Sequence, residues 1–460
     1  MQRLRRTLKT MKNALFGTYA RGFISTYLIV MIIGSLLLKL PLSVQSGVHL
    51  PWIDAIFTAA SALSVTGLTT VVVSQTFTIF GQTVLILIIQ FGGIGLIMMI
   101  AMFWLVVRKR IGFKQRNMIM TDQNQLSRKG IVRFIRNVII MIFVIEGIAF
   151  IIIGARLYYA GYFPLDEALF QAFFLTISLF TNAGFDIAPA NDSYMMFAND
   201  YIMQGIGMTL IFLGAVGFWV LAEIKEWFVA KAKRQTFEFS LYVNIVVVMY
   251  LLLWFGGALG IYILEYNEFL SDKSVLESIF YALFMSITTR NAGFSTMDIN
   301  EFSSTTQVLM MALMFIGASP NSVGGGIRTT TFLVVVLSVV AFARGTNDVL
   351  IKNRKIKRET VHKSYVTIVA SAALVLFVLF TISFIEPHAT SVLAFEVTSA
   401  FGTTGLSMGV TDQLGPLSKI IIAFLMFIGR MGVLALLLIF RPKEKKRGLV
   451  EYPETDIIVG

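Results

Sequence analysis

The chain has 460 residues, of which 56% are hydrophobic and 14% are charged, and this composition excludes an ordinary soluble protein. The lack of cysteine excludes disulfides and thiolate metal sites, and three histidines far apart in the sequence argue against a zinc site. The net charge of +12 does not indicate nucleic-acid binding, because the basic residues fall in short segments beside apolar runs. We therefore expect an all-α polytopic membrane protein.

Long apolar runs alternate with short ones along the chain. A membrane-spanning helix needs about 20 apolar residues, and the pattern predicts eight spans in four repeats. Each repeat has a first span, a short run and a second span, in the order 23–40, 52–65, 83–107; 138–154, 168–180, 201–222; 241–264, 279–289, 306–343; and 364–385, 392–401, 420–440. The repeats occupy residues 1–115, 116–235, 236–355 and 356–441, and a polar tail follows at 442–460.

The short runs cannot cross a membrane. A helix of about 14 residues reaches roughly 21 Å, whereas the apolar core of a bilayer is about 30 Å thick. We expect each short run to enter and return on the same side as a re-entrant helix. Non-helical backbone at that depth is tolerated only where protein buries it or water lines it, which favours four runs around one central pore.

A glycine turn ends each short run. The four glycines are 117, 109 and 112 residues apart, a regularity that a single soluble domain has no reason to show. The turns comprise Val65, Thr66 and Gly67; Asn182, Ala183 and Gly184; Asn291, Ala292 and Gly293; and Thr403, Thr404 and Gly405. A pore built from four similar segments accounts for this repetition.

These twelve residues suit a cation filter. Removing water from an alkali cation requires several oxygen ligands at once, and rings of backbone carbonyls supply them without full charges in the membrane. Glycine permits the backbone angles that direct successive carbonyls to one axis. We interpret the turns as a selectivity filter. The alternative is that each glycine only ends a short buried helix.

A serine lies six residues before the turn glycine in three repeats. These serines are Ser61, Ser178 and Ser399, whereas Ile287 takes this place in the third repeat. Serine and threonine often bond to nearby helical backbone, so we expect a structural role for them.

Small residues also recur in the second spans. The pairs are Gly92 with Gly95, Gly214 with Gly217, Gly317 with Pro320, and Gly429 with Gly432. In every repeat except the third, we interpret these pairs as sites of close helix packing.

The second span of the third repeat departs from this pattern. As one helix it would reach about 57 Å, nearly twice the apolar core, and its proline and three successive glycines disfavour helix. We predict two helical pieces joined by a loop that gates the pore beneath the filter. A simple kink is the alternative. The residues assigned to the gate are Gly317, Ser319, Pro320, Gly324, Gly325, Gly326 and Arg430.

Three charged residues lie in or beside predicted membrane segments. Arg430 occupies the middle of the last span, where a charge is costly unless it faces a pore or a partner. We expect carbonyls or hydroxyls of residues 319–330 to bind it. Arg290 precedes the third turn and Glu146 lies in a first span. For these two, a buried ion pair and a direct role in the ion path are equal alternatives.

Charge predicts the orientation of the spans. The segments that join one repeat to the next, together with both termini, hold 31 of the 38 Lys and Arg residues. Both termini are therefore expected in the cytoplasm, with the short runs entering from outside. Acidic residues of the outer loops would favour cations at the pore mouth, and they are Asp186, Asp192, Asp200, Glu268, Asp298 and Glu301.

The four turns, the broken second span of the third repeat and Arg430 closely resemble the Trk/Ktr/HKT superfamily of potassium transporters, over essentially the whole chain. Eight spans without an additional N-terminal pair are most similar to the Ktr membrane subunit. The resemblance implies K⁺ uptake across the cell membrane, with no tightly bound cofactor and with Na⁺ as a candidate modulator. It also implies a homodimer and a cytosolic ring of RCK-type subunits whose nucleotide binding controls the gate. Glycine in all four turns, including Gly67, implies a preference for K⁺ in this superfamily.

Two partners suit the basic segment at 344–363, namely that ring and anionic membrane lipid. Two other functions also stay open. An alternating-access cation transporter can use repeats and broken helices, but these repeats are parallel and only one second span is expected to be broken. A less selective Na⁺ and K⁺ pathway is the other alternative. An enzyme is not expected, because no catalytic motif occurs in the sequence.

Overall fold

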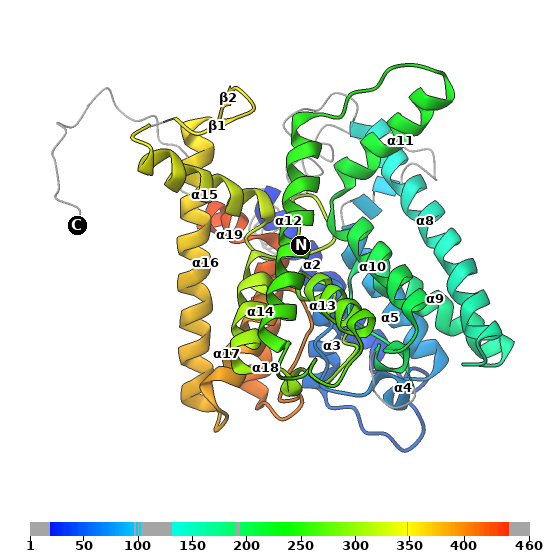
Figure 1. Ribbon diagram of the computed structural model, residues 1–460. Coiled ribbons are helices and arrows are strands. Elements are labelled where there is room, and N and C mark those ends of the chain that lie inside the picture. The colour runs from blue at the N-terminus through cyan, green and yellow to red at the C-terminus, as the bar shows by residue number, and fades with distance from the viewer. Residues whose placement is uncertain are drawn as a thin grey trace, which may run out of the picture.

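The computed structural model describes residues 19–95, 98, 99, 101, 102, 131–188, 194–346 and 348–440, and it is predominantly helical (Figure 1). Three of the described helices, Val132–Tyr159, Leu241–Glu265 and Arg358–Ile385, are long and apolar enough to cross a membrane. A fourth is added if the bent pair Tyr201–Ala215 and Phe218–Ala232 counts as one span. The predicted helical class is confirmed, and the predicted total of eight spans stays a prediction.

Each repeat contributes a long helix, a short helix and an interrupted helix. The long helices are α2 (Tyr19–Leu38), α8 (Ile131–Tyr159), α12 (Leu241–Glu265) and α16 (Arg358–Ile385). The short helices are α3 (Trp52–Ser64), α9 (Leu165–Thr181), α13 (Val275–Thr289) and α17 (Thr390–Gly402). The interrupted helices comprise α5 (Ile79–Ile94), α10 (Tyr201–Ala215) with α11 (Phe218–Ala232), α14 (Ser304–Ile316) with α15 (Thr329–Ala343), and α18 (Pro416–Met431) with α19 (Val433–Phe440). Single turns are α4 (Val73–Thr76), η1 (Met195–Phe197) and η2 (Ile299–Glu301).

All four second spans are interrupted, whereas the sequence predicts a break only in the third. That prediction is wrong because, in the first, second and fourth repeats, the second glycine of the pair interrupts the helix. Gly95, Gly217 and Gly432 have φ of 95°, 106° and 84° with extended ψ, a conformation that side chains strongly disfavour. The bend between α10 and α11 is 103°. Arg328 holds the same conformation before α15, with φ 80° and ψ 141°, although it is not glycine.

The first glycine of each pair packs as predicted. A Cβ built on Gly92, Gly214 or Gly429 would collide with a backbone carbonyl of the short helix in the same repeat. The carbonyls belong to Leu63, Phe180 and Phe401, each two residues before the turn begins. Only glycine lets the interrupted helix approach the end of the short helix this closely.

One small β-hairpin departs from the all-α prediction. β1 (Leu350–Ile351) pairs antiparallel with β2 (Arg354–Lys355), and the two connecting residues, Lys352 and Asn353, both have positive φ. Two successive residues with positive φ form the type of tight turn that matches the twist of paired strands. The hairpin lies within the basic segment that joins the third repeat to the fourth.

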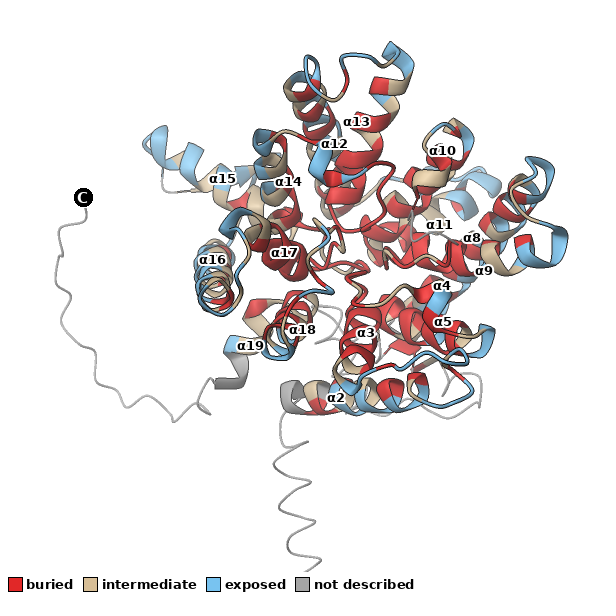
Figure 2. Cartoon of the chain, turned by 90° about the horizontal axis from the view of Figure 1, so that it is seen from below, coloured by how far each residue is buried: buried red, intermediate tan, exposed pale blue. Residues whose placement is uncertain are grey.

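The four repeats close into a ring around the short helices, as the view in Figure 2 shows. In each case the first half of an interrupted helix packs against the short helix of the next repeat. The pairs are α5 with α9, α10 with α13, α14 with α17, and α18 with α3. The last pair joins the fourth repeat to the first and completes the cycle.

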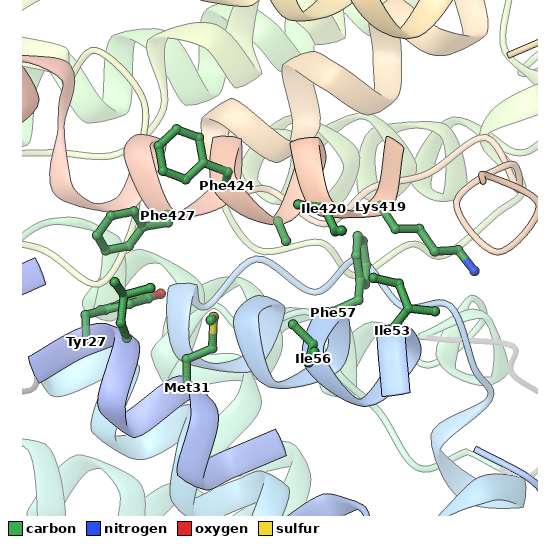
Figure 3. A pocket seen from close by; sticks show the side chains of 11 residues that line it. Tyr27, Met31, Ile53, Ile56, Phe57, Lys419, Ile420, Phe424 and Phe427 are labelled. Carbon is green, nitrogen blue, oxygen red and sulfur yellow. The ribbon is translucent and has the colours of Figure 1, made fainter. Parts of the chain in front are cut away.

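An ion pair seals this last junction. Lys419 of α18 donates to Asp54 of α3 at 2.9 Å, and both residues are only 8% exposed. Beside them residues of α2, α3 and α18 line an apolar cleft of about 150 Å³ (Figure 3). At its other end the rings of Tyr27 and Phe427 are in contact, with centroids 4.5 Å apart. The first and fourth repeats are thus joined by one buried charge pair and by apolar contacts.

We predict that Lys419→Met destabilises the folded protein by about 3–5 kcal/mol, because it leaves Asp54 buried without its cation. Thermal or chemical denaturation of the purified protein in detergent measures the change in the free energy of unfolding. Lys363→Met is the control, because Lys363 pairs with Glu359 on an exposed face. Equal stability of the two variants would contradict the structural importance of the buried pair.

Candidate functional site

The four turns share an unusual backbone. Their glycines all have positive φ, at 97° for Gly67, 67° for Gly184, 76° for Gly293 and 93° for Gly405. In three repeats the residue that ends the short helix is also left-handed, although Val65, Asn182 and Thr403 carry side chains. For β-branched Val65 and Thr403 this conformation is strained, and strain of this kind persists where the surroundings impose it.

Hydrogen bonds to the short helix impose that conformation. The amide of Thr66 donates to the carbonyl of Ser61 at 2.9 Å, and the amide of Gly67 donates to the Ser61 hydroxyl at 3.1 Å. Thr404 and Gly405 bond to Ser399 in the same way, at 2.9 and 3.0 Å. The predicted structural role of these serines is confirmed.

The second and third repeats use variants of this arrangement. Ser178 accepts from the amide of Phe185 at 3.1 Å and donates to the same residue's carbonyl. In the third repeat, Thr288 donates to the carbonyl of Phe294 at 2.6 Å. Thr288 is not found by aligning the repeats on their turn glycines, because Ile287 takes the position of the serines and Thr288 lies one residue later.

The four turns meet in cyclic order. A Cβ built on Gly67 would lie 2.7 Å from the carbonyl oxygen of Ala183, and one built on Gly184 would lie 3.0 Å from that of Ala292. Each remaining glycine meets the next repeat in the same way. Gly293 lies against the carbonyl of Thr404, and the ring closes where Gly405 lies against that of Thr66.

The carbonyls of this ring are available to a ligand. Within the described part of the chain, the carbonyl oxygens of Thr66, Ala183, Ala292 and Thr404 accept no backbone hydrogen bond, whereas the amides around them bond back to the short helices. The structure therefore brings together the four turn glycines and the residue before each, which are eight of the twelve predicted filter residues. Unbonded carbonyls that converge from four segments can replace the hydration shell of a cation.

An open vestibule lies beside the glycine ring. It has a volume of about 400 Å³, and all four turn glycines line it together with Asp186, Asp298 and Asp412. Asp186 and Asp298 are among the acids predicted at the mouth, and Asp412 was not singled out from the sequence. Carboxylates around a confined mouth raise the local concentration of cations.

The other predicted acids do not line the vestibule. Asp192 lies outside the described residues. Asp200 accepts from Arg156 at 2.9 Å and caps the start of α10. Glu268 and Glu301 are not among the lining residues.

A buried glutamate holds the segment that follows the fourth turn. Glu396 of α17 is fully buried and accepts from the hydroxyls of Ser407 and Thr411, both at 2.6 Å, and from the amide of Met408 at 2.9 Å. An acidic residue inside the short apolar run at 392–401 is the sequence signal that could have identified it. These bonds fix the wall of the vestibule next to Gly405.

The loop between α14 and α15 lies directly against the turns. A Cβ on Gly324 would collide with the side-chain amide of Asn291, and one on Gly325 would lie 2.6 Å from the hydroxyl oxygen of Thr403. In the described part of the chain, the Asn291 amide and the Thr403 hydroxyl have no hydrogen-bond partner. Buried polar groups normally have partners, so this junction suits a water molecule or a passing cation.

The same loop is held by the second repeat. The amide of Ser319 donates to the carbonyl of Ala215 at 3.2 Å, and the amide of Phe218 donates to the carbonyl of Asn321 at 2.7 Å. Both bonds use backbone groups released where α10 breaks from α11. The predicted loop between two helical pieces is confirmed, and its position is fixed by the break in the neighbouring repeat.

Arg430 binds this loop as predicted. Its guanidinium donates to the carbonyls of Ser322 at 3.2 Å and Gly324 at 3.4 Å, and to that of Val323 between them. It also donates to the carbonyls of Gly92 at 2.6 Å and Gly93 at 3.0 Å. One arginine of the fourth repeat thus joins the loop of the third repeat to α5 of the first.

Arg328 adds a second link that the sequence analysis did not identify. It donates to the carbonyl of Gly324 and, at 3.2 Å, to the backbone carbonyl of Arg430. Its strained backbone and these bonds place two arginines beside one loop. The position takes glycine in the other repeats, and that difference is the signal that a comparison of the repeats could have used.

Neither ion pair considered for Arg290 and Glu146 is present among the described residues. Arg290 is fully buried, donates to the carbonyl of Gly317 at 2.7 and 3.1 Å, and lies 4.5 Å from the ring centre of Tyr250. Glu146 accepts from the amide of Gln90. Backbone and amide dipoles take the place of the expected opposite charges.

Known proteins resemble this chain over nearly its whole length. Residues 18–448 match the family model TrkH, described as a cation transport protein. The chain is 41% identical over 436 residues to the Ktr system potassium uptake protein D of Bacillus subtilis, which covers 94% of this chain and 95% of that protein. It is 29% identical over 444 residues to the potassium/sodium uptake protein NtpJ of Enterococcus hirae, with coverage of 94% and 95%.

A solved structure has the same fold. The crystal structure of the potassium transporter TrkH from Vibrio parahaemolyticus matches with a TM-score of 0.67 and 18% identity, covering 92% of this chain and 85% of that chain. The resemblance stated from the turns, the loop and Arg430 is confirmed. The chain belongs to the TrkH/Ktr family of membrane cation transport proteins, and it is a transporter rather than an enzyme.

Proposed function

We propose that this chain takes up K⁺ across the cell membrane through the pore that the four turns surround. The observation that carries the proposal is the cyclic contact of each turn glycine with the carbonyl before the next one. Four equivalent sets of carbonyls suit a partly dehydrated K⁺, and the acids of the vestibule favour cations at its entrance. The names of the related Ktr proteins support K⁺ as the transported ion.

The loop between α14 and α15 is proposed as the gate. It lies against Asn291 and Thr403 of the filter, and polar glycine-rich backbone at such depth must line water or be buried by protein. Arg430 acts as the latch, because it binds the loop and α5 together. Releasing either set of carbonyls would free the loop to move away from the filter.

The proposed assembly is a homodimer in the membrane, with both termini in the cytoplasm and a cytosolic RCK-type ring as regulator. The words "Ktr system" in the relative's name support a multi-component transporter. The exposed hairpin of β1 and β2 lies in the basic segment proposed to meet this ring or anionic lipid.

Uptake of Na⁺ as well as K⁺ is the second candidate, and the name of the related potassium/sodium uptake protein NtpJ favours it. A single broken second span was one argument against an alternating-access mechanism. That argument no longer holds, because all four second spans are interrupted. The cyclic ring of turns still supports a single central pore, since inverted repeats would place a site between two halves.

Gly67→Ser should weaken the discrimination of K⁺ from Na⁺, because its new side chain would press on the carbonyl of Ala183. We expect the ratio of K⁺ to Na⁺ flux into liposomes to fall about fivefold or more, equivalent to about 1 kcal/mol. Rubidium flux serves as a third measurement. Gly47→Ser is the matched control, since Gly47 has φ 86° but nothing within 4 Å of an added Cβ. Unchanged selectivity of Gly67→Ser would count strongly against the filter.

Deletion of residues 323–326 should raise K⁺ flux through the purified protein, because the segment that faces Asn291 and Thr403 is removed. Flux into liposomes, normalised to the amount of folded protein, measures this. If the deletion variant is produced at normal levels and its K⁺ flux is unchanged, the gate proposal is contradicted.

For Arg430→Ala we expect higher K⁺ flux without loss of assembly, because the loop loses its bonds to α5. Arg430→Lys should give an intermediate flux, since the single ammonium of lysine cannot bond the loop carbonyls and the α5 carbonyls at once as the guanidinium does. Size-exclusion chromatography checks assembly. An unfolded Arg430→Ala product, with Arg430→Lys behaving as the unaltered protein, would favour a purely structural role.

A further inference from the structure

Three buried glutamates differ in how their carboxyl groups are bonded. Glu265 accepts from the amide of Ser303 at 3.0 Å, from its hydroxyl at 2.7 Å and from the amide of Phe269 at 3.4 Å. Glu396 likewise gathers three donors around it. Several donors around a carboxyl group satisfy the lone pairs of its oxygens. Glu146 lacks such a set.

A single amide faces Glu146. Both of its carboxyl oxygens lie 3.0 Å from the Nε2 of Gln90, which belongs to α5 of the first repeat. Glu146 and Gln90 are each only 7% exposed, and Glu146 lies midway along α8. An ionised carboxylate at such a position, with one neutral donor group, would carry a large desolvation cost.

The oxygen of the Gln90 side-chain amide has no hydrogen-bond partner among the described residues. This atom, Oε1, is buried. A protonated carboxylic acid carries one O–H donor beside its acceptor oxygen. A rotation of either end group would let this O–H donate to Oε1 while Nε2 donates back. Both residues would then be satisfied, which no arrangement of the ionised form achieves with this one amide.

The charged groups on the surrounding helices do not compensate a negative charge. On α8 itself, Arg136 and Arg156 are each ten residues from Glu146, or about 15 Å along the axis, and Arg133 lies farther away still. No charged residue occurs on α5. The charges on α9, α10 and α11 lie in end turns, bond elsewhere or, for Glu226, are exposed, and they are Asp166, Glu167, Asp200, Glu223, Lys225, Glu226 and Lys231.

We propose that Glu146 and Gln90 form a proton-binding site inside the membrane, with Glu146 held as a neutral acid paired to the amide. The site joins α8 of the second repeat to α5 of the first. Gln90 lies two residues before Gly92, whose carbonyl Arg430 binds. The bound proton therefore holds in place the end of α5 on which the Arg430 contact depends.

Infrared spectroscopy of the full-length protein in lipid nanodiscs at neutral pH tests the site directly. The spectrum should contain the C=O stretching band of a protonated acid that Glu146→Gln removes and that Glu265→Gln, the matched control, leaves in place. Gln90→Leu should shift this band to higher frequency, because the acid loses its hydrogen bond. Glu146→Gln should keep K⁺ flux, since glutamine is the neutral isostere of the acid.

Two results would overturn the proposal. One is a difference spectrum of the unaltered protein and Glu146→Gln that shows only an ionised carboxylate. The other is loss of the acid band when Na⁺ or K⁺ is added at constant pH, which would make this a metal-cation site. If Glu146→Gln does not fold, the Gln90→Leu band shift decides, and an unshifted band contradicts the pairing. None of these spectra depends on transport, so they stand apart from a failure of the proposed function.

Discussion

The direction of the hydrogen bonds in each turn controls the rest of the structure. Amides at the start of the turn bond back to the short helix, so the carbonyls are left to face the centre. Serine and threonine side chains such as Ser61 and Thr288 complete this anchoring from inside the repeat. The glycine must then lie at the axis, because any Cβ there meets a carbonyl of the neighbouring repeat. The left-handed residues that end the short helices and the ring of turn glycines both follow from this arrangement of hydrogen bonds.

Periodic runs and repeated glycines were sufficient to locate the short helices, the turns and the loop of the third repeat. Each is determined by local backbone chemistry, which a single sequence records. The breaks at Gly95, Gly217 and Gly432 were harder to predict, because a glycine that packs closely and a glycine that bends a helix have the same local signature. Only their positions against other repeats distinguish the two roles.

The partners of buried charges could not be predicted from the sequence either. A search for opposite charges fails at Arg290 and Glu146, because their partners are a carbonyl and an amide from other helices. Arg430 was easier, since the polar loop it binds is itself conspicuous. Asp412 lines the vestibule, and Glu396 holds the segment beside it, through the fold of the fourth repeat, and no spacing rule connects them to Gly67.

The closure of the ring by the last repeat has a consequence for how the chain is made. Gly405 meets Thr66, and Lys419 meets Asp54 across 365 residues of sequence. Until the fourth repeat has been synthesised, the first turn therefore lacks one of its two neighbours, and its anchored carbonyls face an incomplete wall. The earlier repeats must wait in the bilayer as a partial assembly, so biogenesis is governed by the most distant contacts in the chain.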